Sequence, residues 1–246
     1  AKWLFLEFFE IPKSDDRWRD GRGVYTSYIW GVRGQMVQVI LLDVRYHRSP
    51  FLETDEEMAP RKEKYVPDKD DQTKTMLGEE QWAWFEHQLT ITADIRLIVS
   101  SIQVLAEGHG FECWRMLPHE RRRFLISVAN AKGGIPIILS GDRLVGGFYE
   151  MSDYGVVEVT ASSWTHTIPY GAFDDCQNAK QCDEKDAKRI GDLVRVNHFG
   201  SIDIDWDNRK VKVTLRSTES SLPQHERGTN AGEIIQSQTF DIPKNT

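Results

Sequence analysis

Short runs of β-branched and aliphatic residues alternate with amphipathic segments in the first 140 residues of the chain. Three runs predict buried strands, at 35–43, 95–100 and 135–140. Between them, the segment 77–89 places Trp82, Phe85 and Leu89 on one face at helical spacing, and Pro118 opens a second helix to Asn130. This order of strands and helices predicts an α/β layered core, with a site in the loops that follow the strands.

Beyond Tyr154 the pattern changes to strands without helices between them, at 156–160, 201–206, 210–215 and 234–242. We expect these strands to pair in antiparallel fashion. A turn sequence at 207–209 predicts a hairpin from Ile202 to Leu215. The charged segment 52–75 predicts a long surface loop that could cover a cleft. The simplest organisation is a single domain over 1–246, with an α/β part at 1–150 and mostly antiparallel strands at 151–246.

The composition favours a soluble globular protein, since 39% of the 246 residues are hydrophobic and 28% are charged. No apolar run approaches the roughly 20 residues that cross a bilayer, so we expect no transmembrane segment. The 31 Lys and Arg residues against 38 Asp and Glu residues give a formal charge of -7. A field of this sign repels nucleic acid, which we therefore exclude as a partner.

The chain begins at Ala1 without an initiator Met or the order of a signal peptide, so we expect upstream residues to have been removed or to be missing. Cys176 and Cys182 bracket a polar stretch, and we expect a disulfide between them, with two free thiols as the alternative. Such a bond would favour a secreted, periplasmic or organelle-lumenal location. Cys113 lies between aromatic residues and is expected to be buried as a small apolar side chain.

Asp43 and Arg45 end the first predicted strand on one face, so we expect a structural ion pair between them. The seven histidines show no helical i, i+4 pair and no His-x-His pair, which argues against a metal centre built from histidines. His166 is the best isolated candidate, because it follows Ser162 and Ser163 at a predicted strand end.

Several longer motifs occur in a fixed order over almost the entire chain. They are Leu41-Leu42-Asp43-Val44-Arg45, Leu77-Gly78-Glu79-Glu80-Gln81-Trp82, Ser100-Ser101-Ile102-Gln103-Val104, His109-Gly110-Phe111-Glu112-Cys113-Trp114, Ser140-Gly141-Asp142-Arg143 and Asn197-His198-Phe199-Gly200. Their order resembles the C-terminal portion of the PhoD-like (alkaline phosphatase D) metallophosphatases.

This resemblance implies a calcineurin-like metallophosphoesterase fold, with two facing mixed β-sheets flanked by helices, incomplete at the N-terminus. Enzymes of this kind use a two-metal site to activate water and to neutralise charge on the phosphoryl oxygens. The early metal motifs of the family lie in an N-terminal half that has no counterpart here. We therefore expect no cofactor for this chain alone, and divalent metals (Fe, Ca or Zn) only if an N-terminal half is present.

The family pattern after the third strand is Ser-Gly-Asp-Arg-His, in which the histidine is expected to bind metal, but position 144 is a leucine here. By resemblance, Asp142 is a vestigial metal ligand and Arg143 a phosphate-binding and catalytic candidate. His109 and Glu112 are the other catalytic candidates. The alternatives are a turn aspartate at 142 and a surface ion pair at 143. We expect these four residues to cluster at one edge of the sheets, with Leu144 toward the metal position.

Two functions follow. The first is a PhoD-like relic or fragment, inactive alone, that acts as a structural or binding subunit. Another protein chain would then cover the sheet edge left open. The second is an active metal-dependent phosphomonoesterase or phosphodiesterase when an N-terminal half completes it.

Overall fold

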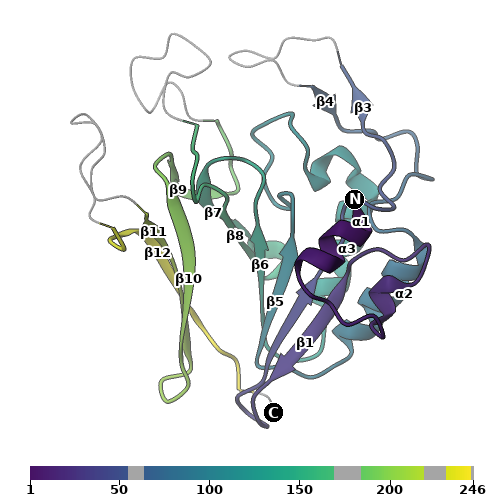
Figure 1. The fold of residues 1–246 in the computed structure, drawn as a ribbon. Coiled ribbons are helices and arrows are strands. Elements are labelled where there is room, and N and C mark those ends of the chain that lie inside the picture. Colours follow the sequence, from purple (N-terminus) through teal and green to yellow (C-terminus); the bar gives the residue numbers. More distant parts are fainter. Residues whose placement is uncertain (55–63, 169–183, 219–230, 245–246) are drawn as a thin grey trace.

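The computed structural model describes the chain except for residues 55–63, 169–183, 219–230 and 245–246 (Figure 1). Its centre is a seven-stranded mixed sheet in the order β1-β2-β5-β6-β8-β7-β9. The strands of this sheet are β1 (Thr26–Trp30), β2 (Val37–Leu41), β5 (Ile95–Ser100), β6 (Ile135–Ser140), β7 (Gly146–Met151), β8 (Val156–Ala161) and β9 (Arg189–Val194). The fold is therefore mixed α/β with one large mixed sheet, as the sequence predicted at this level.

The middle of the large sheet is parallel, because β2, β5, β6 and β8 run in the same direction. The strands predicted at 95–100 and 135–140 coincide with β5 and β6. The expectation for 156–160 was wrong in its pairing. This segment forms β8, which pairs parallel with β6 and antiparallel with β7 inside the large sheet, not with the later strands. The prediction failed because β7 was not expected as a strand: its two initial glycines, Gly146 and Gly147, mask the strand preference of Phe148 and Tyr149.

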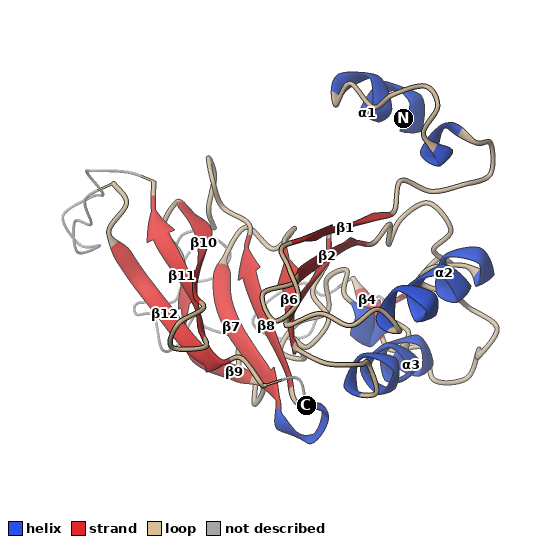
Figure 2. Ribbon diagram, turned by 90° about the horizontal axis from the view of Figure 1, so that it is seen from below, coloured by secondary structure: helices blue, strands red, loops and turns tan. Residues whose placement is uncertain are grey.

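One face of the large sheet is covered by α2 (Glu79–Leu89) and α3 (Pro118–Ala129). Figure 2 shows both helices on the same side of the sheet. The predicted stripe is confirmed, since Trp82, Phe85 and Leu89 are all buried. The rings of Phe85 and Phe124 stack with centroids 5.4 Å apart, which joins the two helices.

A buried carboxylate on α3 accepts hydrogen bonds from α2 and from the residues that precede it. Glu120 is 5% exposed and accepts hydrogen bonds from the Trp82 indole at 2.7 Å, the Met76 backbone N–H at 2.6 Å and the Thr75 hydroxyl at 2.9 Å. A buried carboxylate with three donors holds the start of α2 against α3.

The second sheet has the order β10-β11-β12 and is antiparallel throughout, not mixed. Its strands are β10 (His198–Asp205), β11 (Lys210–Ser217) and β12 (Ile234–Asp241). The predicted hairpin is confirmed, with Ile202 opposite Val213. Val211, Val213 and Leu215 share a buried apolar cluster with side chains of the large sheet, including Ile137 and Val159. Figures 1 and 2 show this sheet on the side of β7 and β8, away from β1.

Smaller elements surround the two sheets. The ends of the predicted surface loop form a two-stranded ribbon of β3 (Leu52–Glu53) and β4 (Tyr65–Val66). The remaining helices are α1 (Lys2–Phe8) and the 3-10 turns η1 (Asp16–Trp18), η2 (Trp114–Met116) and η3 (Ser152–Tyr154). None of the helices in the described ranges has the length and apolar character needed to span a membrane.

The structure tests the prediction for one of the three cysteines. Cys113 is a buried free thiol, as predicted, and burial raises its pKa to about 11. Cys176 and Cys182 lie outside the described residues, so their disulfide stays a prediction.

Candidate functional site

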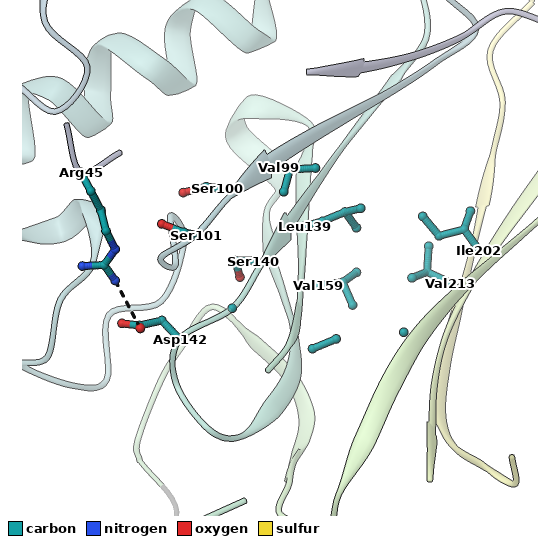
Figure 3. A pocket seen from close by; sticks show the side chains of 13 residues that line it. Arg45, Val99, Ser100, Ser101, Leu139, Ser140, Asp142, Val159, Ile202 and Val213 are labelled. Atoms are coloured by element: carbon teal, nitrogen blue, oxygen red, sulfur yellow. Dashed lines mark ion pairs between the residues drawn. The ribbon is translucent and has the colours of Figure 1, made fainter. Parts of the chain in front are cut away.

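A cavity of about 660 Å³ opens where β5, β6 and β8 end, between the large sheet and β10 (Figure 3). Parallel strands present their carboxyl ends at one edge of a sheet, which brings the loops after β2, β5 and β6 together there. Arg45, Ser101 and Asp142 form a polar rim. The interior is apolar, and Val99, Leu139 and Ile202 line it. The cavity therefore has one polar and one apolar end.

Arg45 organises the polar rim. Its guanidinium lies 2.7 Å from a Glu112 carboxylate oxygen and 3.3 Å from Asp142 Oδ1. The other oxygen of Glu112 lies 2.6 Å from the guanidinium of Arg48. Burial alone would raise the pKa of Glu112, but the hydrogen bonds from Arg48 and Arg45 outweigh it and hold that pKa below its ordinary value. Two guanidinium groups and two carboxylates thus form one connected network.

The expected ion pair between Asp43 and Arg45 is not formed. The carboxylate of Asp43 instead accepts backbone N–H groups of Val24 at 2.9 Å, Arg45 at 3.0 Å and Tyr46 at 2.9 Å. Strand β2 ends at Leu41, so the chain already turns at Asp43 and the rule that i and i+2 share a face no longer applies. The Arg45 side chain is free to reach Glu112 and Asp142.

Asp142 follows β6 in a left-handed conformation, with φ at 72°, and its side chain is 43% exposed. Leu144 is also left-handed, with φ at 55°, and is 37% exposed. Leu144 is not among the residues that line the cavity. The cavity therefore gives no support to the expectation that Leu144 points toward a metal position beside Asp142.

Arg143 turns into the protein. It is 5% exposed, forms an ion pair with buried Glu184, and places its guanidinium carbon 4.7 Å from the centroid of the Phe111 ring. A phosphate would have to compete with Glu184 for this guanidinium. Its phosphate-binding and catalytic roles remain predictions.

His109 is 1% exposed and belongs to a buried chain of hydrogen bonds. Its Nδ1 accepts the Phe111 backbone N–H at 3.1 Å, which leaves Nε2 to donate to Gln103 Oε1 at 2.9 Å. Gln103 then donates to the Thr160 hydroxyl at 2.8 Å. Thr160 and Ser140 hydroxyls are 2.9 Å apart, so the chain of contacts reaches the loop that carries Asp142.

Glu158 lies two residues before Thr160 on β8 and is fully buried. Its carboxylate accepts the backbone N–H groups of Val104 at 2.9 Å and Leu105 at 2.5 Å. Desolvation raises its pKa, against the opposing effect of these hydrogen bonds. Neither Glu158 nor Arg48 was expected from the sequence to lie at the site, and Ser101 was named only as part of a motif. A lone acidic residue inside an otherwise apolar strand was the available signal for Glu158.

The four predicted site residues thus gather around the ends of β5 and β6. Glu112 and Asp142 share Arg45, Arg143 lies over Phe111, and Phe111 lies between His109 and Glu112 in the chain. Their proximity is a matter of geometry, and their roles stay predictions.

The side chains present do not fit the divalent metals that the resemblance implies. Within the described ranges, no group of three or more His, Cys, Asp or Glu side chains could hold a metal ion. Asp142 offers one carboxylate, and that carboxylate faces a guanidinium. A stable site needs three or four protein donors.

A family model and several solved structures match this chain. A model of the PhoD-like phosphatase family matches residues 4–215. A solved structure described as "Structure of PhoD" is similar over 90% of this chain, at 14% identity and a TM-score of 0.63. A structure of GAP50, described as the anchor in the inner membrane complex of Plasmodium, is similar over 90% of this chain, at 14% identity and a TM-score of 0.55. No curated protein sequence matches.

The two neighbours are much longer than this chain. The similar region covers 42% of the PhoD chain and 55% of the GAP50 chain. At 14% identity, these likenesses bear on the fold alone.

Proposed function

Since this chain belongs to the PhoD-like phosphatase family, we propose that it carries one wall of a phosphatase-like site and acts as a structural or binding subunit without turnover of its own. The observation that carries this proposal is the pairing of Asp142 with Arg45. The Asp142 carboxylate, at the ligand-like position, forms an ion pair with Arg45. No group of three metal donors surrounds it among the described residues.

The charge balance of the rim supports the proposal. Arg45 and Arg48 contribute two positive charges, and Glu112 and Asp142 contribute two negative charges, so the connected network has no surplus charge. Divalent cations bind where carboxylates or other anionic donors are in excess. A cation beside Asp142 would also meet the guanidinium of Arg45, which repels it.

An active metal-dependent phosphomonoesterase or phosphodiesterase, completed by an N-terminal half, is the second candidate. The cavity of about 660 Å³ with a rim of Arg45, Ser101 and Asp142 favours it, because clefts with a few convergent polar groups are typical of enzyme sites. In that case the missing ligands for Fe, Ca or Zn come from the other half, and Asp142 would have to leave Arg45.

Metal analysis of the intact natural material separates the two candidates. A two-metal enzyme carries about two ions per copy, whereas a subunit without turnover carries none above background. A stoichiometry near two, removed by the substitution Asp142→Asn, would replace the first candidate with the second.

We also infer that the two sheets correspond to the facing sheets of calcineurin-like metallophosphoesterases. The apolar cluster common to Val211, Val213, Ile137 and Val159 supports this inference. The description of GAP50 as an anchor gives a precedent for a structural role on a fold of this kind.

A further inference from the structure

His198 lies at the junction between the two sheets. It is the first residue of β10, and its backbone N–H donates to the carbonyl of Ser163, just beyond the end of β8, at 2.8 Å. The hydroxyl of Thr218, just beyond the end of β11, donates to the carbonyl of Trp164 at 3.3 Å. These two bonds attach the small sheet to the segment that follows β8, and we call this region the junction.

The imidazole of His198 is buried in the junction. It is 1% exposed, and its Nδ1 lies 2.8 Å from the carbonyl oxygen of Val196, so Nδ1 carries the proton and donates it. Within the described chain, Nε2 has no hydrogen-bond partner. Gly146, at the start of β7, packs against this nitrogen so closely that a Cβ there would lie 2.5 Å from it. The neutral ring therefore fits the junction, and a proton on Nε2 would meet no acceptor of the described chain.

The groups that face His198 from β7, from the segment after β8, from the link to β9 and from β11 are uncharged. They are Gly146, Ser163, Val196 and Ser217.

Arg195 and Arg216 are the charged neighbours of these residues in the chain. Arg195 donates to the carbonyl of Ile168 at 3.2 Å. Arg216 donates to the hydroxyl of Ser201 at 3.0 Å. Both are positive, so neither offsets a positive charge on the His198 ring. Burial accordingly lowers the pKa of His198 below its ordinary 6.5, against the opposing effect of the bond to the Val196 carbonyl.

We propose that His198 is a pH-sensitive switch between the two sheets: in its neutral form it holds β10 against the ends of β7 and β8, and its protonation opens the junction. Opening would widen the cavity, because Leu139 and Val159 of the large sheet and Ile202 of β10 line it from opposite sides (Figure 3). This inference goes beyond the proposed function, since it holds whether or not the chain turns over a phosphoester.

The direction of the effect follows from which state binds the proton. In the opened junction His198 is exposed to water and titrates near its ordinary 6.5, whereas the buried ring binds a proton less readily. The stabilisation by the neutral ring is therefore complete above pH 6.5 and is lost as the pH falls below that value toward the folded pKa. At about pH 5.5 the opened state should be up to about ten-fold more populated than at about pH 7.5.

Amide hydrogen exchange of the full chain at these two pH values, corrected for the intrinsic effect of pH on exchange, measures the opening. The amides of His198 and Thr218 report on the junction, because they donate to the carbonyls of Ser163 and Asn197. We expect their protection to fall by up to about ten-fold at the lower pH. Ile98, in the centre of β5, should keep its protection.

Two matched variants isolate the ring. His198→Asn keeps a side-chain donor for the Val196 carbonyl but cannot take up a proton, so protection at Thr218 should lose its dependence on pH. His87→Asn makes the same change at an exposed position on α2 and should keep that dependence. Equal dependence on pH in the two variants would overturn the proposal.

A titration of the unmodified chain needs no variant. The carbon-bound ring protons of His198, followed by NMR, should report proton uptake below the ordinary 6.5, together with the loss of protection at Thr218. Three results would overturn the proposal: unchanged protection at the junction, an equal fall at Ile98, or proton uptake by His198 at its ordinary pKa while Thr218 stays protected. The second result would mean that the whole fold opens and not the junction.

Discussion

The two faces of the large sheet differ in how completely the chain covers them. On one face, Ile40, Ile98 and Ile138 form a row across three strands and are 0% exposed beneath α2 and α3. On the other face, the next row of Leu41, Val99 and Leu139 is half-buried. The first face is covered by helices that connect neighbouring strands. The second face is covered by the sheet of β10, β11 and β12, and only over part of its area.

Because of this difference, we expect the helical face to determine the stability of the fold and the other face to determine binding. The helical face buries its apolar groups and gives its buried carboxylate, Glu120, three donors. The other face leaves an apolar cavity, an unpaired strand edge among the described strands, and a charge-balanced rim. Substitutions on the first face should change the free energy of unfolding, and substitutions on the second should change binding.

The largest expected effect comes from neighbouring truncations on opposite faces of β5. Ile98→Ala should lower the free energy of unfolding by about 3 kcal/mol, because it opens a cavity in a fully buried cluster. Val99→Ala should cost about 1 kcal/mol, because Val99 already borders a cavity and is partly exposed. Urea unfolding of both variants measures the difference. Equal losses would show that the two faces are equally well packed.

A second effect tests the polar centre of the helical face. Glu120→Ala should lower the free energy of unfolding by about 2 kcal/mol, since it leaves buried donors of Trp82 and Met76 unpaired. Glu120→Gln keeps one acceptor oxygen and should cost less. Thermal and urea unfolding of the pair provide the measurement, and a larger loss for the glutamine variant would contradict the assignment.

The buried Glu158 gives a smaller, pH-dependent effect. Because desolvation raises its pKa above the ordinary 4.5, the folded state binds a proton that the unfolded state releases. Its contribution to stability is therefore fully present below pH 4.5 and is lost as the pH rises toward the folded pKa. Glu158→Gln should flatten the dependence of unfolding free energy on pH in this window. An unchanged pH profile would show that Glu158 does not titrate as described.

The smallest expected effect is on metal binding. Leu144→His should not create tight binding of zinc, iron or calcium, because Asp142 and one imidazole remain below the three or four donors of a stable site. Calorimetric titration of both chains checks this expectation. Submicromolar binding by the variant alone would show that further donors are already in place.

Local patterns predicted the helical face and the hairpin well. Apolar runs defined β5 and β6, helical spacing defined α2, and the turn between Ile202 and Leu215 defined the hairpin. These features depend on residues that are near one another in the chain. The pairing of β8 depended on β7, whose paired glycines gave no strand signal, and could not be read locally.

The candidate site was predictable in position but not in its contacts. The resemblance placed Asp142 and Glu112 in loops after neighbouring strands, and in the structure both contact Arg45, while their roles stay predictions. The predicted partner of Arg45 was wrong. Because the chain turns after Leu41, the Arg45 side chain contacts Glu112 and Asp142, which lie 67 and 97 residues away in the sequence. Long side chains choose partners across the fold, which sequence spacing does not reveal.

Hydrolysis of p-nitrophenyl phosphate and bis(p-nitrophenyl) phosphate by the purified chain, with zinc, iron and calcium added in turn, measures whether this chain has turnover of its own. We expect rates equal to those of a metal-only blank, for the original chain and for Asp142→Asn alike. Turnover clearly above the blank that disappears in Asp142→Asn would contradict this expectation, because Asp142 would then serve a metal and not Arg45.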